Sequence, residues 1–489
     1  MMSCPTLNSN GTVQDFWAKP EKLFVLISLF FGFLLAFLTP IFTNFDEVEH
    51  FYKVYGLSSG TLNFKKITLS NDGFKQYEKP YTFCAQQVPL DLVQVAEQSR
   101  FLSPYFDEKG VSHNGAKLNA LNYFAHIFDR THLNPQTLII YSNPGYTAVS
   151  YVLHIPVLAV LKLFGASAFF MVFLLRLCSL FLYTSLVYHA IKTIPFKKYL
   201  LLFVSIMPSV LYVCSGVNTD YLIIGLSFLF SARVLNYAFG EDNGQIGKRE
   251  IFLLGALMFL ICVSKFTYLP LILLYFVIPK EKFETQKLRL CGFFTILLAC
   301  IGWVAGFLAY TVHTMDGVFS YYNERSASGS IAFLLSHPFS FVKSIFTSLK
   351  VNGFDYVLTA VSDFGLSETK LPASAVVFYI ILLFLNAFGR PQKEVYMKTT
   401  AKVLFVFAVV LSLVLIFCSD FIIFPLEASG SISGFKGRYL IPVLPLFFLV
   451  FLNNRLCFEK LRLKNITLLY SLFFLLLFCA VIVSRYYIF

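Results

Sequence analysis

The feature that most constrains this chain is a series of long apolar segments that contain almost no charged residue. The first of them, LFVLISLFFGFLLAFL, is uncharged throughout. A helix needs about 20 mostly apolar residues to cross the hydrocarbon core of a bilayer. Charged residues make up only 13% of the chain, against roughly 25% in soluble domains. Because so few polar groups cannot cover a soluble globule, we expect an all-α polytopic membrane protein.

Eleven apolar segments are candidates for membrane-spanning helices. Several of them are short, and a connection separates each from the next. The candidates are 23–42, 166–191, 199–217, 220–239, 250–264, 266–279, 289–312, 372–388, 402–424, 439–453 and 466–484. The sequence therefore predicts a bundle of about 11 transmembrane helices.

The basic residues between these segments predict the orientation of the chain. Cytoplasmic connections of membrane proteins carry an excess of Lys and Arg. Here every second connection is basic, and these connections contain IKTIPFKK, GKRE, PKEKFETQKLR, GRPQKEVYMKTTAK and NNRLCFEKLRLK. We expect them and the N-terminus to be cytoplasmic. Because the net charge of +12 lies in these connections rather than on one basic face, we expect membrane lipids but no nucleic acid as partners.

This orientation divides the chain into four parts. One of these parts includes a large extracytoplasmic loop, 43–165, which follows the first span and is the largest polar segment of the chain. The parts are a cytoplasmic N-terminus (1–22), an N-terminal transmembrane module (23–312), an extracytoplasmic loop (313–371) and a C-terminal transmembrane module (372–489). Within the third part, SIAFLLSHPFSFVKSIFTSLK has an apolar stripe interrupted by lysines, which predicts an amphipathic helix on the outer leaflet.

One further apolar segment, YTAVSYVLHIPVLAVLKLF at 146–164, is also long enough to cross. A crossing there would place IKTIPFKK and GKRE outside and would break the charge pattern. We therefore expect this segment to lie in the outer interface, with Tyr146, Tyr151 and His154 as polar anchors.

An acidic cluster follows the first apolar segment directly. Asp46, Glu47 and Glu49 precede His50 in FDEVEHFYKVYGLSSG, whose apolar residues recur with helical spacing. A structural role is one interpretation, because Asn44 and Glu47 have the spacing of a capping box and acids suit the first turn of a helix. A functional role is the other, because ionisable residues at a membrane boundary are functional candidates.

The same stretch, PIFTNFDEVEHFYKVYGLSSG, resembles the first-loop signature of DUF2142, a family of bacterial polytopic membrane proteins. Four further segments resemble other parts of that family in the same order. They are NPGYTAVSYVLHIPVLAVLKLFG, MPSVLYVCSGVNTDYLIIG, KFTYLPLILLYFVIP and GFKGRYLIPVLPLFF. The family is similar to GT-C glycosyltransferases, which take a sugar from a polyprenyl phosphate and use an acidic residue of the first outer loop.

This resemblance implies an inverting glycosyltransferase in the bacterial cytoplasmic membrane, acting on a cell-surface glycan acceptor at the outer face. A single displacement needs one carboxylate as general base for the acceptor hydroxyl. We expect Asp46 to be that base, since it shares a helix face with His50, and Glu47 is the alternative or an orienting partner. The two acids together are also a candidate site for a divalent cation, Mg²⁺ or Mn²⁺.

The departing phosphate needs positive charge, and Arg matches phosphate oxygens best. Arg438 in KGRYLIP is the candidate, with Tyr439 beside it to stack on a sugar ring. Lys436 and Lys265 are further candidates, although isolated lysines at a boundary often only extend toward headgroups. Asp220 either caps the helix that it begins or binds a ligand.

Arg176 lies inside an apolar segment, where we expect it to face the bundle and pair with a carboxylate as a structural element. Two other functions compete with sugar transfer. A transporter or flippase for lipid-linked saccharides would carry charges near the bilayer midplane and often repeated halves, and neither is evident here. A polysaccharide polymerase is the other alternative; by analogy it would rely on basic loops rather than on an acidic first loop.

Overall fold

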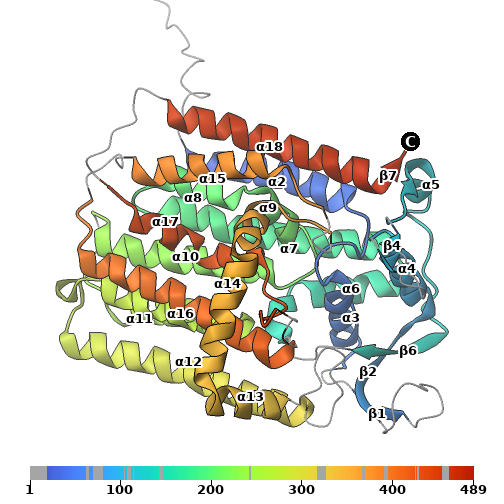
Figure 1. Ribbon diagram of the computed structural model, residues 1–489, viewed down its shortest axis with the longest axis horizontal. Coiled ribbons are helices and arrows are strands. Elements are labelled where there is room, and N and C mark those ends of the chain that lie inside the picture. The colour runs from blue at the N-terminus through green and yellow to red at the C-terminus, as the bar shows by residue number, and fades with distance from the viewer. Residues whose placement is uncertain are drawn as a thin grey trace, which may run out of the picture.

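The computed structural model describes most of the chain. It covers residues 19–489 apart from 62–64, 70–80, 104, 107–111, 114, 142–146, 242–243, 316–326, 366–368, 390–394, 425, 427–428 and 454–461. Tyr146 and most of the first 22 residues therefore lie outside the described residues. The protein is mostly helical, as the sequence predicts, and the long helices lie side by side in one bundle (Figure 1).

Six helices of the described residues are long and apolar enough to cross a membrane. This confirms a helical membrane protein. The six coincide with predicted spans and are α2 (Pro20–Leu38), α7 (Ala168–Thr193), α10 (Asp220–Phe239), α12 (Gln286–Met315), α16 (Thr399–Ile423) and α18 (Leu463–Tyr486).

The other predicted spans form shorter or interrupted helices, and proline explains several interruptions. A proline ring cannot donate a backbone hydrogen bond and clashes with the preceding turn. Segment 199–217 is divided at Pro208 into two helices, while Pro270 and Pro442 lie in 3₁₀ turns. The elements are α8 (Lys198–Ser205), α9 (Pro208–Cys214), α11 (Lys248–Ser264), η2 (Phe266–Val277), α15 (Ala373–Phe388), η4 (Gly437–Val443) and α17 (Leu444–Val450). Every residue of α9 is buried, so this broken segment belongs to the core of the bundle.

The basic connections contact one another across the bundle. Lys197 donates to the carbonyl oxygens of Asn386 and Gly389, and Ile246 forms a β-bridge with Phe283. Two more contacts join the remaining connections: Lys402 Nζ donates to the Leu452 carbonyl, and the Lys464 ammonium lies 4.1 Å from the Tyr199 ring centroid. These contacts form two groups, and Figure 1 shows the helix ends that carry both groups at the end of the bundle opposite β7.

Segment 43–165 lies at the other end, where α18 finishes (Figure 1). Its helices are α3 (Glu47–Ser58), α4 (Leu90–Arg100), α5 (Ala120–Ala125), η1 (Ala148–Tyr151) and α6 (His154–Leu163). It also contains an antiparallel sheet of β1 (Lys65–Leu69), β2 (Tyr81–Pro89) and β6 (Gln136–Tyr141), in the order β1-β2-β6. The sequence did not predict this sheet.

The segment that we expected to lie in the outer interface, 146–164, forms no long helix in its described residues, 147–164. Its main element, α6, has ten residues, so at 1.5 Å per residue it is about 15 Å long, half of the hydrocarbon thickness. The first loop is also tied to the end of the chain, because β5 (Leu118–Asn119) pairs in parallel with β7 (Tyr487–Ile488).

The amphipathic segment after α12 forms two helices, whereas the sequence predicted one. They are α13 (Ala327–Ser336) and α14 (Pro338–Val361), and Pro338 begins the second. Figure 1 shows α14 running across the direction of the bundle helices. It packs on η4, where a Cβ added at Gly437 would overlap the α14 backbone. Its outer face exposes large apolar residues such as Phe339, Phe346 and Phe354 beside exposed Lys350.

Candidate functional site

The turn between α2 and α3 presents Asp46 and Glu47 to different surroundings. Asp46 precedes α3 in the left-handed conformation, with φ of 53°, and its side chain forms no capping hydrogen bond. Such a backbone conformation is unfavourable for a residue other than glycine and is held by its surroundings. The predicted capping box is wrong, because Asn44 Oδ1 accepts from Phe45 N and its Nδ2 donates to the Tyr212 carbonyl.

Glu47 is fully buried and forms a two-pronged ion pair with Arg176. The Arg176 Nε and Nη2 atoms donate to its two carboxylate oxygens at 2.8 and 2.6 Å. The same oxygens accept from the backbone N–H groups of Val217 and Phe42. Arg176 in turn donates to three carbonyl oxygens at the end of α2. The expected structural pairing of Arg176 with a carboxylate is confirmed, and Glu47 is that partner.

Asp46 instead contacts Arg438, 392 positions away in the chain. The Arg438 Nη2 atom lies 2.6 Å from Asp46 Oδ2, and its Nε atom lies 3.2 Å from Asp220 Oδ2. The guanidinium also lies 4.3 Å from the centroid of the Phe45 ring. The Arg438 side chain is 7% exposed, whereas the Asp46 side chain is 50% exposed. A buried arginine thus holds a carboxylate that a ligand can still reach.

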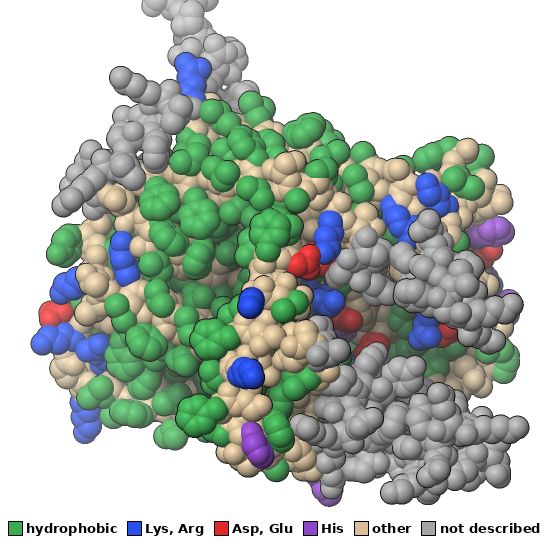
Figure 2. All heavy atoms as spheres, viewed as in Figure 1, with side chains coloured by type: hydrophobic (Ala, Val, Ile, Leu, Met, Phe, Trp, Pro, Cys, Tyr) green, Lys and Arg blue, Asp and Glu red, His purple; other side chains and the backbone are tan. Residues whose placement is uncertain are grey.

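Charged side chains of both signs gather between α14 and α3 on the face shown in Figure 2. Lys265, which follows α11, places its ammonium 3.7 Å from the Tyr439 ring centroid. The Tyr439 carbonyl accepts from Tyr268. One face of the Tyr439 ring is therefore covered by Lys265. Lys436 is half-buried at the start of η4, two residues before Arg438.

Asp220 is the first residue of α10, but it is not the residue that caps the helix. Asn218 Oδ1 accepts from the backbone N–H groups of Asp220 and Tyr221. The Asp220 carboxylate is thereby free to pair with Arg438, so its role lies with that guanidinium.

Electrostatics keep Asp46 ionised. Burial would raise the pKa of its carboxyl, but the positive charges of Arg438, Lys265 and Lys436 oppose this effect, and the pKa lies below its ordinary value. His50 donates to or accepts from the Tyr151 hydroxyl at 2.6 Å through Nδ1. Burial lowers the pKa of His50 to about 4, against the opposing effect of Asp46 and Asp220, so the imidazole is neutral at physiological pH.

Sequence reasoning missed Asp420, a buried residue of α16. Its Oδ2 atom has no hydrogen-bond partner among the described residues, and it interacts electrostatically with Lys265 and Arg438. A carboxylate inside an apolar run is the signal that could have identified it.

The two adjacent acids do not fit a shared divalent cation. A hard cation takes carboxylate oxygens that are open to it, but each Glu47 oxygen already accepts two hydrogen bonds. Asp46 faces the guanidinium of Arg438. The described residues contain no cluster of three His, Cys, Asp or Glu side chains suited to a metal.

Comparison with known proteins gives one family. A search of curated proteins and a search of solved structures each gave no significant match. The family model described as "Predicted membrane protein (DUF2142)" matches residues 29–447, which include every site residue described above. The match covers most of the 489 residues. The chain therefore belongs to the DUF2142 family of membrane proteins.

Proposed function

We propose that this protein transfers a sugar from a polyprenyl-phosphate donor to a cell-surface glycan acceptor, as a GT-C-type inverting glycosyltransferase. One observation carries the proposal: a half-exposed carboxylate, Asp46, lies 2.6 Å from a buried guanidinium, Arg438. Transfer from a lipid phosphate needs a base and a phosphate-binding cation within one substrate length of each other, and this pair supplies both.

The proposal includes an orientation of the chain in the bacterial cytoplasmic membrane. In it the shorter helices complete about eleven crossings, and the N-terminus is cytoplasmic. Contacts among the basic connections support it, together with the position of their helix ends at one end of the bundle (Figure 1), because cytoplasmic ends are basic. Asp46 and segment 43–165 then face the exterior.

In the reaction, the acceptor oxygen bonds to the anomeric carbon while the bond from that carbon to the phosphate oxygen breaks. The acceptor proton passes to Asp46, and the electron pair leaves with the polyprenyl phosphate. Arg438 neutralises the charge on this leaving group. Because Asp220 also contacts Arg438, the guanidinium stays in place when the phosphate competes with Asp46 for it. His50, Lys265 and Lys436 line the surroundings of the pair.

The test is sugar transfer in membranes supplied with a panel of radiolabelled polyprenyl-phosphate sugars. We expect one donor to label a glycan, and Asp46→Asn to abolish labelling while the protein stays in the membrane. Glu97→Gln is the matched control, since Glu97 is an exposed acid of the same segment and pairs with Arg100 at the surface.

Full transfer by Asp46→Asn would refute the role of the carboxylate. Movement of the intact donor across the bilayer without sugar transfer would refute the transferase and favour a flippase instead. If the glycan is labelled only when the radiolabelled sugar is already part of a lipid-linked repeat unit, a polymerase would be favoured.

A further inference from the structure

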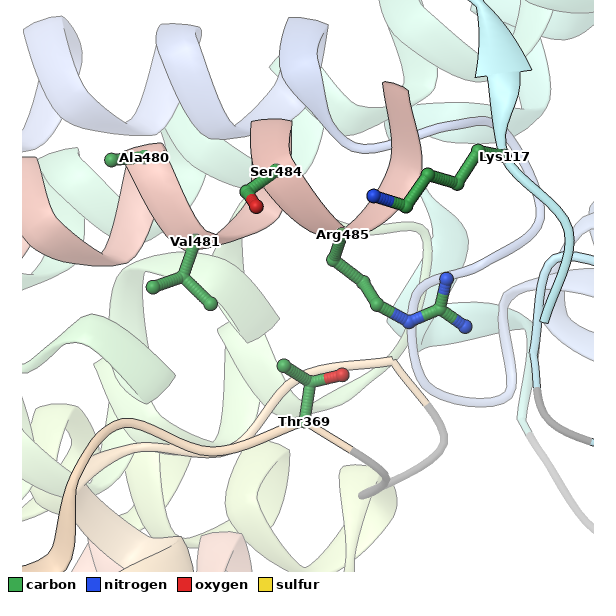
Figure 3. Close-up of a pocket in the computed structure, with 6 residues that line it drawn as sticks. All are labelled: Lys117, Thr369, Ala480, Val481, Ser484 and Arg485. Carbon is green, nitrogen blue, oxygen red and sulfur yellow. The ribbon is translucent and has the colours of Figure 1, made fainter. Parts of the chain in front are cut away.

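A second set of cations lines a pocket at the C-terminal end of α18, outside the residues of the Asp46 site. The pocket has a volume of about 520 Å³, within the roughly 300–1,000 Å³ of typical small-molecule sites. It lies where α18, the residues before β5 and the segment after α14 meet (Figure 3). Its lining residues are Lys117, Thr369, Ala480, Val481, Ser484 and Arg485.

The chemistry of the pocket changes along α18. Ala480 and Val481 lie one turn before Ser484 and Arg485, so they are about 6 Å closer to the middle of the helix. Figure 3 shows the methyl groups at one end of the pocket and the charged groups at the other. Since α18 is long and apolar enough to cross a membrane, this order matches an amphiphile with its head group at the helix end.

The guanidinium of Arg485 is held in place before any ligand binds. Its Nη2 atom donates to the Leu102 carbonyl of the first loop. A Cβ added at Gly115 would overlap both of these groups, so only glycine allows the loop to approach so closely. A guanidinium has five N–H donors, and one bond to Leu102 leaves donors available to a ligand.

The charge of the pocket is positive. Lys117 is exposed, and its side chain extends from the residues before β5 toward the last turn of α18 (Figure 3). No carboxylate is present among the residues that line the pocket in the described part of the chain. Ser484 and Thr369 add two hydroxyl donors. Two cations and two hydroxyls without an acid are the groups that bind a phosphate.

We propose that this pocket binds a membrane lipid whose head group carries a phosphate. The phosphate oxygens accept from Arg485, Lys117 and the neighbouring hydroxyls, while the first part of an acyl chain lies along Ala480 and Val481. This site is separate from the phosphate-binding role proposed for Arg438, and it does not depend on sugar transfer.

Native mass spectrometry of the delipidated full-length protein tests the site with two lipids of equal tails, phosphatidylglycerol and diacylglycerol. We expect retention of phosphatidylglycerol but not of diacylglycerol. Lys117→Gln and Arg485→Gln should each lower that retention about tenfold, since a charged hydrogen bond contributes about that factor or more. Lys350→Gln, at an exposed lysine of α14 outside the pocket, is the matched control and should retain the lipid.

Arg485→Gln also removes the contact to the Leu102 carbonyl and could therefore disturb folding. Lys117→Gln avoids this problem because Lys117 is exposed, so the test remains decisive. Equal retention by wild type and Lys117→Gln would overturn the site. Equal retention of diacylglycerol and phosphatidylglycerol would overturn the role of the phosphate. Binding of inorganic phosphate without retention of phosphatidylglycerol would overturn the lipid as its source.

Discussion

Exchange of Glu47 for Gln separates the structural acid from the proposed catalytic one. Both side chains of the Glu47–Arg176 pair are at most 1% exposed. Gln keeps one acceptor oxygen and replaces the other with an NH₂ group. In either orientation this NH₂ faces two donors, Arg176 Nε with Val217 N–H, or Arg176 Nη2 with Phe42 N–H.

The magnitude follows from those contacts. Two buried donors without acceptors cost roughly 1–3 kcal/mol each, which agrees with the roughly 3–5 kcal/mol typical of breaking a buried ion pair. We therefore expect Glu47→Gln to lower the free energy of unfolding by about 4 kcal/mol. Asp46→Asn should change it by less than about 1 kcal/mol, because an ion pair to a half-exposed carboxylate is screened by solvent.

The assay is equilibrium unfolding in mixed detergent micelles, followed by the helical circular dichroism signal. Arg176→Gln serves as the partner variant, and it should be at least as destabilising because Arg176 also donates to three carbonyl oxygens. Wild-type stability in Glu47→Gln would refute the structural role of the buried pair. A loss in Asp46→Asn as large as that in Glu47→Gln would refute the distinction between the two acids.

Three further outcomes are expected. The pKa of His50 is 6.5 in the unfolded chain and about 4 in the folded protein, so the unfolded state binds more protons between these values. The free energy of unfolding should therefore fall by about 3 kcal/mol as the pH is lowered from 6.5 to 4. A difference in this free energy between wild type and His50→Gln that does not change with pH would contradict this prediction. Arg438→Lys should weaken both turnover and donor affinity in the transfer assay, whereas unchanged donor affinity would argue against phosphate binding. A thiol tag in 390–400 should resist an impermeant reagent in intact cells while a tag in 105–115 reacts, and the opposite result would overturn the orientation.

The apolar segments were predictable because hydropathy depends on residues that are adjacent in the chain. All six long helices coincide with predicted spans, and α10 has the predicted bounds, 220–239. The breaks inside shorter segments depend on prolines such as Pro208 and Pro338, each of which begins a new helix within a segment that is continuous in hydropathy. The sheet of β1, β2 and β6 was not predicted, and the pairing of β2 with β6 joins residues far apart in the chain.

The candidate site was predictable in its members but not in their pairing. Arg438 and Asp220 were identified as candidates at the ends of apolar segments, and the structure brings them together with Asp46. The capping interpretation failed because Asn44 is drawn toward the Tyr212 carbonyl, a group 168 positions away. Local sequence patterns contain no information about such a partner.

The adjacent acids have different surroundings because Asp46 precedes α3 in the left-handed conformation, whereas Glu47 is the first residue of the helix. The Glu47 side chain pairs with Arg176 of α7, and the Asp46 side chain pairs with Arg438 of η4. A charge rule would have anticipated this division. An arginine within an apolar segment is expected to pair with a buried acidic residue. Arg176 therefore pairs with one of the two acids, and the other acid can pair with Arg438. The same rule indicates that Asp420, a buried carboxylate that interacts electrostatically with Lys265 and Arg438, belongs with the charges around Asp46 rather than with the surrounding apolar core.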